Sequence, residues 1–161
     1  MERWANRKFS EDPSPPNASS ISFLAEFGNR SVLFTGDARS GSLIEGIDRL
    51  LAERGATKLK IDAFKVPHHG SKNNLSNELM ERIDAKHFLL SSSGHKYNHP
   101  DSDAVARIIF HSEKPILHFN YWSKDNKDWD RSTWKAELGY ETVFPEESEP
   151  GLAVEFDVKD R

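Results

Sequence analysis

The chain has 161 residues, a formal net charge of −4 and a pI near 6.0. A chain of this length can bury about 70% of its unfolded surface, which suffices for one hydrophobic core but not for two, so we expect one folded domain. The acidic balance argues against a dedicated nucleic-acid binder, and the absence of cysteine leaves only histidine and carboxylate side chains as metal ligands.

The first twenty residues are polar and contain the sequence Asp-Pro-Ser-Pro-Pro-Asn at positions 12–17. This composition disfavours helix and strand alike. We therefore expect an N-terminal arm or linker over residues 1–20 and a folded domain over residues 21–161. No apolar stretch follows the first charges, and no segment approaches the roughly 18 apolar residues of a membrane span, so we expect a cytoplasmic protein without a membrane contact.

The next segment has the pattern of a β-hairpin. Apolar runs at residues 21–27 and 31–35 flank Gly28-Asn29-Arg30, which is typical of a tight turn between two strands. The second strand would place Asp37 at its far end.

Helical and strand-like patterns then alternate along the chain. We expect helices around residues 43–51, ended by Gly55, around residues 75–83, from the cap Asp101 through residue 109, and over residues 131–138. We expect strands at residues 61–66, 88–90, 116–119, 141–144 and 152–158. Together these elements predict a layered α/β (α+β) fold in which a mixed sheet carries helices on one face.

Asp37 is the first candidate for chemistry. It follows Gly36, whose missing side chain allows an ion or a ligand to approach, and a carboxylate there could bridge two cations. The structural alternative is that Asp37 caps the helix that begins near Ser40 or Ser42.

The adjacent residues His68 and His69 are the sharper signal. Two imidazoles followed by Gly70 and Ser71 at the end of an apolar strand are difficult to explain by packing. The alternative is one buried, hydrogen-bonded histidine beside a solvated one. The position at a strand end favours a metal or catalytic site.

His99 lies in the loop 94–100, which is expected between a strand and a helix, and it could donate a proton or hold a phosphate oxygen. It could equally be an exposed loop histidine. The aromatic and charged stretch 121–129 could stack on a base or form a rim with half-buried aromatics. We assign no role to His87, His111 and His118.

Residues 17–109 resemble the C-terminal half of metallo-β-lactamase-fold hydrolases, most closely their ComEC-like competence-protein branch. The matching elements occur in family-like order and spacing, and they are Asn17-Ala18-Ser19-Ser20, Thr35-Gly36-Asp37-Ala38, Asp62-Ala63-Phe64-Lys65-Val66-Pro67-His68-His69-Gly70-Ser71 and Tyr97-Asn98-His99-Pro100. The resemblance implies an αββα sandwich with two zinc ions, of which this chain is one half. Asp37 would bridge the metals, His69 would ligate one of them because the family's usual ligand directly precedes a glycine, and His68 would face the substrate.

The family's first-half signature, an H-x-H-x-D-H run with another upstream histidine, is absent, because no two histidines of this sequence stand at i and i+2. That half supplies most of the metal ligands in the family. The resemblance therefore implies a natural half, a truncated copy or a degenerate copy.

Two hypotheses follow. The first is a zinc-dependent hydrolase, a phosphodiesterase or nuclease, that is active only with a complementary N-terminal half and uses His68 or His99 to assist the leaving oxygen. The second is a non-catalytic half-domain that assembles through its sheet face with that half or as a homo-oligomer. Six residues offer more apolar surface than one layer of helices can cover, namely Ile21, Phe23, Leu24, Phe27, Leu33 and Phe34. The sequence does not choose between phosphodiester, phosphomonoester and carboxylic ester substrates.

Overall fold

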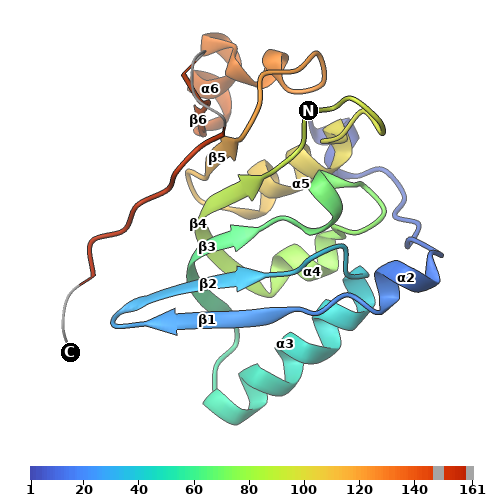
Figure 1. Ribbon diagram of the computed structural model, residues 1–161, viewed down its shortest axis with the longest axis vertical. Coiled ribbons are helices and arrows are strands. Elements are labelled where there is room, and N and C mark those ends of the chain that lie inside the picture. Colours follow the sequence, from blue (N-terminus) through green and yellow to red (C-terminus); the bar gives the residue numbers. More distant parts are fainter. Residues whose placement is uncertain (147–150, 159–161) are drawn as a thin grey trace.

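A computed structural model describes residues 1–146 and 151–158 (Figure 1). The described residues form a six-stranded sheet in the order β1-β2-β3-β4-β5-β6. The strands are β1 (Phe23–Phe27), β2 (Arg30–Phe34), β3 (Leu59–Lys65), β4 (Ile83–Leu90), β5 (Ile116–Phe119) and β6 (Glu141–Val143). The β1–β2 hairpin is antiparallel and every other pair is parallel, so the predicted mixed sheet is confirmed.

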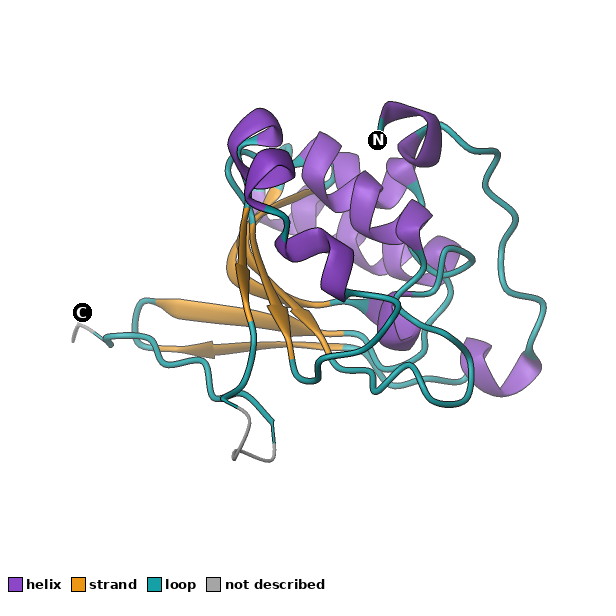
Figure 2. Cartoon of the chain, turned by 90° about the horizontal axis from the view of Figure 1, so that it is seen from above, coloured by secondary structure: helices purple, strands orange, loops and turns teal. Residues whose placement is uncertain are grey.

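Helices gather on one side of this sheet, as predicted (Figure 2). The α-helices are α1 (Glu2–Ala5), α2 (Pro15–Ala18), α3 (Ser40–Arg54), α4 (Asn77–Glu81), α5 (Ser102–His111) and α6 (Ser132–Leu138), and two 3₁₀ turns are η1 (Pro67–Gly70) and η2 (Lys127–Asp130). The long helix α3 ends where Gly55 adopts a left-handed conformation, as expected from the sequence.

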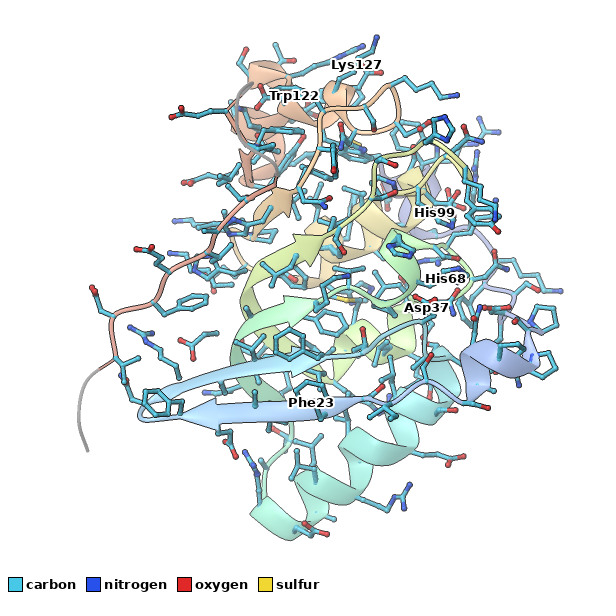
Figure 3. All side chains as sticks on the ribbon, viewed as in Figure 1. Phe23, Asp37, His68, His99, Trp122 and Lys127 are labelled. Atoms are coloured by element: carbon cyan, nitrogen blue, oxygen red, sulfur yellow. The ribbon has the colours of Figure 1, made fainter. Side chains whose placement is uncertain are left out.

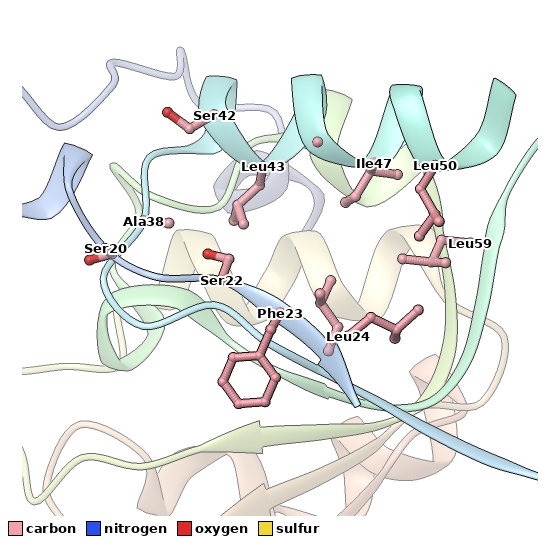
Figure 4. A pocket seen from close by; sticks show the side chains of 12 residues that line it. Ser20, Ser22, Phe23, Leu24, Ala38, Ser42, Leu43, Ile47, Leu50 and Leu59 are labelled. Atoms are coloured by element: carbon pink, nitrogen blue, oxygen red, sulfur yellow. The ribbon is translucent and has the colours of Figure 1, made fainter. Parts of the chain in front are cut away.

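The core lies between this layer of helices and the sheet. Phe64 and Phe88, on the neighbouring strands β3 and β4, are fully buried and meet edge to face with their ring centroids 6.1 Å apart. A cleft of about 340 Å³ opens between α3 and β1, and Figure 4 shows the ring of Phe23 on the side of the strand away from the helix. Alternate residues of the hairpin therefore face opposite ways.

Two elements differ from the prediction. The helix expected over residues 75–83 is only the short α4, because Ile83 begins β4 and pairs with Leu59 in the parallel ladder. The strand expected over residues 152–158 is wrong, because this segment joins no ladder among the described residues. Its alternating apolar residues instead cross the sheet face opposite the helices, where Phe156 lies with its ring centroid 5.1 Å from that of His87.

The N-terminal segment does contain helical turns, contrary to the expectation from its composition. Helix α2 begins at Pro15, a position at which the fixed φ of proline suits the first helical turn. The segment also packs on the domain, since Ala5 is buried and Arg107 donates a hydrogen bond to the carbonyl of Arg7 over 3.1 Å. The expected division at residue 20 stays a prediction. Within the described part of the chain, no helix has both the length and the apolar character that a membrane crossing requires.

Candidate functional site

Three loops that follow β2, β3 and β4 meet at one edge of the sheet, because parallel strands end on the same side. They carry Asp37, the pair His68 and His69, and His99, and Figure 3 shows Asp37, His68 and His99 close together at this edge. Backbone hydrogen bonds join the loops: the His68 amide donates to the carbonyl of Gly36 over 3.0 Å, and the Asp101 amide donates to that of Gly70 over 2.9 Å.

The backbone of the His-His-Gly turn is unusual. His68 and His69 have φ values of 45° and 58°, in the left-handed region that side chains rarely adopt, and Gly70 follows with a φ of 86°. Consecutive residues in this region are costly and persist only where the surroundings hold them. The turn aims two adjacent imidazoles out of the end of β3.

Asp37 and His69 form a pair of potential metal ligands. The Nδ1–H of His69 donates to the carbonyl of Ser91 over 2.6 Å, which leaves a lone pair on Nε2. This Nε2 lies 3.9 Å from Oδ1 of Asp37. Two ligands of a tetrahedral zinc, each about 2.1 Å from the ion, lie about 3.4 Å apart, so a shift of about half an ångström would let both atoms bind the same ion.

Asp37 does not cap helix α3, so the structural alternative for this residue is wrong. The residue at the N-cap of α3 is Arg39, whose side chain makes no capping bond, and the carboxylate of Glu11 accepts from the Gly41 amide in the first turn over 2.7 Å. The Asp37 side chain is 42% exposed and free to meet an ion, while its amide donates to the hydroxyl of Ser20.

Two ligands do not make a complete zinc site, which needs at least three protein groups. Among the described residues, no group of three or more His, Asp or Glu side chains could hold a metal ion. The donor types at Asp37 and His69 therefore suit zinc, but these two residues alone do not form a zinc site.

Lys65, the last residue of β3, was not singled out from the sequence. Burial lowers the pKa of its ammonium, and the negative charge of Asp37 opposes that shift. The ammonium donates to the carbonyl of Val66 over 3.1 Å. A cation near Asp37 partly balances its charge in the absence of a metal.

His68 points into a network of polar side chains instead of pairing with Asp37. Its Nδ1 lies 3.0 Å from Oδ1 of Asn74, 3.5 Å from the amide nitrogen of Asn17 and 3.4 Å from Oδ2 of Asp12. The side chain is partly buried, so it is neither a core histidine nor a freely solvated one.

Asp12 is a member of this site that sequence reasoning missed, because it lies in the segment expected to be an arm. It is only 8% exposed. Burial alone would raise the pKa of its carboxyl, but hydrogen bonds from Asn17, Ser14 and Asn74 and the nearby His68 hold that pKa below its usual range. The sequence around Asp12 predicts only a turn, and the structure has one, in which the Ser14 amide donates to the Asp12 carboxylate over 2.8 Å. Such turns are common at positions without any function, so this pattern did not identify Asp12 as a site residue.

His99 is mostly buried, so the exposed-loop alternative is wrong. Its ring centroid lies 5.5 Å from that of His68, and its Nδ1 lies 3.5 Å from Oδ2 of Asp101. Burial alone would raise the pKa of Asp101, but His99 and the Lys72 amide, which donates over 2.8 Å, hold it below the usual range. Asp101 is the N-cap residue of α5 as predicted, although its side chain makes no capping bond.

An open cavity of about 440 Å³ lies beside His69 and His99. Serine hydroxyls, a lysine and two tyrosines line it: Ser91, Ser92, Ser93, Lys96, Tyr97 and Tyr121. In the stretch 121–129, packing accounts for both tryptophans, since Trp122 stacks on Phe144 with a centroid distance of 3.7 Å and Trp129 is buried. The two tryptophans therefore have a structural role, as expected for a rim with half-buried aromatics. Tyr121 instead lines the cavity beside His69 and His99.

Comparison with known proteins gives one informative similarity. The chain is 29% identical over 135 residues to ComE operon protein 3 of Bacillus subtilis (strain 168), and the match covers 83% of this chain. It spans only 16% of the length of that relative. No protein-family model and no solved structure matches the chain. The similarity agrees with the competence-protein branch expected from the motifs, and membership of the metallo-β-lactamase fold remains a proposal.

Proposed function

We propose that this chain is the C-terminal half of a metal-dependent hydrolase of the metallo-β-lactamase superfamily, a phosphodiesterase or nuclease. The observation that carries the proposal is the pair formed by Asp37 and His69, whose oxygen and nitrogen face each other across 3.9 Å beside two further histidines. The similarity to ComE operon protein 3 supports the same branch. A complementary N-terminal half, outside these 161 residues, would supply the remaining zinc ligands.

The part of this sheet face that residues 151–158 leave exposed supports the need for that half. On the hairpin, Leu24 and Leu33 pack in the core beneath α3, whereas Ile21, Phe23, Phe27 and Phe34 are exposed, with Ile21 83% and Phe27 76% accessible. The ring centroids of Phe23 and Phe34 are 5.0 Å apart, so these two rings form one apolar patch. A second sheet packed on this face would bury these side chains.

The cavity beside His69 suits a phosphodiester. Lys96, whose ammonium lies 4.9 Å from the ring centroid of Tyr97, and the hydroxyls of residues 91–93 could bind phosphate oxygens. Tyr121, which is also exposed, could stack on a base. When bound, the zinc pair would supply a Lewis acid and an activated water. The ring centroid of His68 lies 6.0 Å from that of His69 and 5.5 Å from that of His99, so either His68 or His99 could hold a proton for the leaving oxygen.

The test is hydrolysis of a generic phosphodiester by this chain together with a segment that carries the H-x-H-x-D-H motif. Asp37→Ala should abolish activity, and His69→Ala should lower it by orders of magnitude. His68→Ala and His99→Ala should each lower kcat by about 10² to 10⁴ if that residue is the general acid. Full activity of Asp37→Ala would exclude the proposed site.

The exposed face also favours a second candidate function, a non-catalytic module that assembles through that face with another half or with a second copy of the chain. This candidate predicts a stable complex that holds no zinc and hydrolyses no phosphodiester. Zinc content of the purified complex distinguishes the two candidates directly.

A further inference from the structure

The strongest unassigned feature is the buried amide of Asn74, which connects Asp12, Asp37 and His68. Asn74 is fully buried. Its amide nitrogen lies within hydrogen-bond distance of three oxygens, namely Oδ2 of Asp12 at 3.2 Å and the carbonyls of Asp37 at 3.1 Å and Ala38 at 3.2 Å. All three are acceptors, so the orientation of the amide group is determined: nitrogen toward these oxygens and oxygen toward His68.

This orientation determines where His68 carries its proton. The oxygen of Asn74 lies 3.0 Å from Nδ1 of His68, and an amide oxygen can only accept. The amide nitrogen of Asn17, a donor 3.5 Å from the same Nδ1, is farther away and already donates to Asp12 over 2.6 Å. A neutral His68 therefore carries its proton on Nδ1. Its Nε2, across the ring from Asn74, then carries a lone pair and no proton.

Asp12 completes the arrangement. Its Oδ2 accepts from Asn17 over 2.6 Å and from Asn74, and lies 3.4 Å from Nδ1 of His68. The carboxylate thus holds the Asn74 amide in place beside the ring of His68. Asp12 lies on the segment 1–20, so its bond with Asn74 is one of the contacts that hold this polar segment against the site.

We infer that Asp12 and Asn74 are positioning residues for His68, which hold its ring with Nδ1 protonated and Nε2 free. The role of His68 in proton transfer rests on the proposed function. The arrangement itself can be measured in the isolated, metal-free chain.

Long-range ¹H–¹⁵N correlation of the imidazole rings distinguishes protonated from unprotonated ring nitrogens. Spectra are recorded at about pH 8.5, well above the ordinary imidazole pKa of about 6.5. His68 is assigned by comparison with His68→Gln. The expected result for the natural chain is a proton on Nδ1 of His68. His69, held by the carbonyl of Ser91, serves as an internal reference for the same form.

Asn74→Ala removes the acceptor and should move a large share of His68 to the Nε2-protonated form, while His69 stays unchanged. Asp12→Asn should cause a smaller shift of His68 toward the Nε2-protonated form. The asparagine has one oxygen in place of the two carboxylate oxygens that accept from Ser14, Asn17 and Asn74, so the Asn74 amide is held less firmly. The matched control is Asn73→Ala. The side chain of Asn73 also anchors the N-terminal segment, by donating to the carbonyl of Ser10, whereas it is Asn74 that bonds to His68.

An Nε2-protonated His68 in the natural chain would overturn the inference whether or not any variant folds. So would an Asn74→Ala chain with dispersed spectra and an unchanged His68. Hydrolysis is a separate readout: in a completed assembly, Asn74→Ala should lower kcat by about 10- to 100-fold with zinc content retained. If the tautomers behave as expected but no completed assembly hydrolyses a phosphodiester, the proposed function fails and the positioning role stands.

Discussion

Gly70 packs directly on Pro100, so that a Cβ added at position 70 would lie 2.7 Å from Cβ of the proline. This contact joins the turn that bears His68 and His69 to the loop that bears His99. Position 70 requires glycine for two reasons: its φ of 86° lies in the left-handed region, and a Cβ would have no space beside Pro100. The spacing of His68, His69 and His99 therefore depends on the absence of a side chain at position 70.

Replacement of Gly70 by alanine should destabilise the fold by about 2–4 kcal/mol, because left-handed strain and overpacking act together. The control is Gly139→Ala, since Gly139 has a φ of 69° but no atom within 4 Å of an added Cβ. That variant should lose only about 1–2 kcal/mol. Urea unfolding measures both. Equal losses would show that the contact with Pro100 contributes nothing.

The stability of the chain should fall as the pH drops from about 6.5 toward 4. Burial and the neighbouring imidazole of His87 lower the pKa of His118 to about 4, and His118 is 9% exposed. In this pH window the unfolded chain binds a proton that the folded chain excludes, so unfolding becomes easier as acid is added. The loss amounts to roughly 3 kcal/mol once the pH has reached the folded pKa.

Denaturant unfolding at several pH values between 7 and 4 checks this prediction, with His118→Gln as the comparison. The variant cannot titrate at this position and should show a flatter pH dependence. Some dependence should remain, because burial also lowers the pKa of His87 and of His111. An unchanged slope in His118→Gln would contradict the assignment.

The exposed aromatic face should drive association of the isolated chain. Phe23→Ser combined with Phe27→Ser removes two rings from this face, so sedimentation at micromolar concentration should shift toward the monomer. Phe110→Ser is the matched control, because Phe110 is also exposed but lies on α5, on the helical side of the sheet. A natural chain that sediments as a compact monomer at this concentration would remove the basis for the prediction.

Local patterns predicted most of the fold. The hairpin, α3 with its stop at Gly55, and the parallel strands follow from apolar spacing and turn residues. Sequence pattern also placed Asp37 and the two adjacent histidines at strand ends, and the topology then brought them to one edge. Errors arose where tertiary pairing overrode periodicity, as at Ile83, which pairs with Leu59 in place of extending a helix.

The supporting residues of the site could not be predicted in the same way. Asp12 and Asn74 are separated by 62 positions and interact only because the N-terminal segment folds back on the domain. His87 and His118 received no role, yet Nδ1 of the first lies 2.9 Å from Nε2 of the second. Such contacts depend on the arrangement of whole elements, about which a single sequence carries no local signal.

The most direct test of the central claim is the zinc content of the chain, alone and with its complementary half. After dialysis, the isolated chain should hold clearly fewer than two zinc ions, because Asp37 and His69 cannot complete a dinuclear site. The completed assembly should hold two, and Asp37→Ala and His69→Ala should lower that number while His68→Ala and His99→Ala do not. Two tightly held zinc ions in the isolated chain, or a full zinc content in Asp37→Ala, would contradict the account.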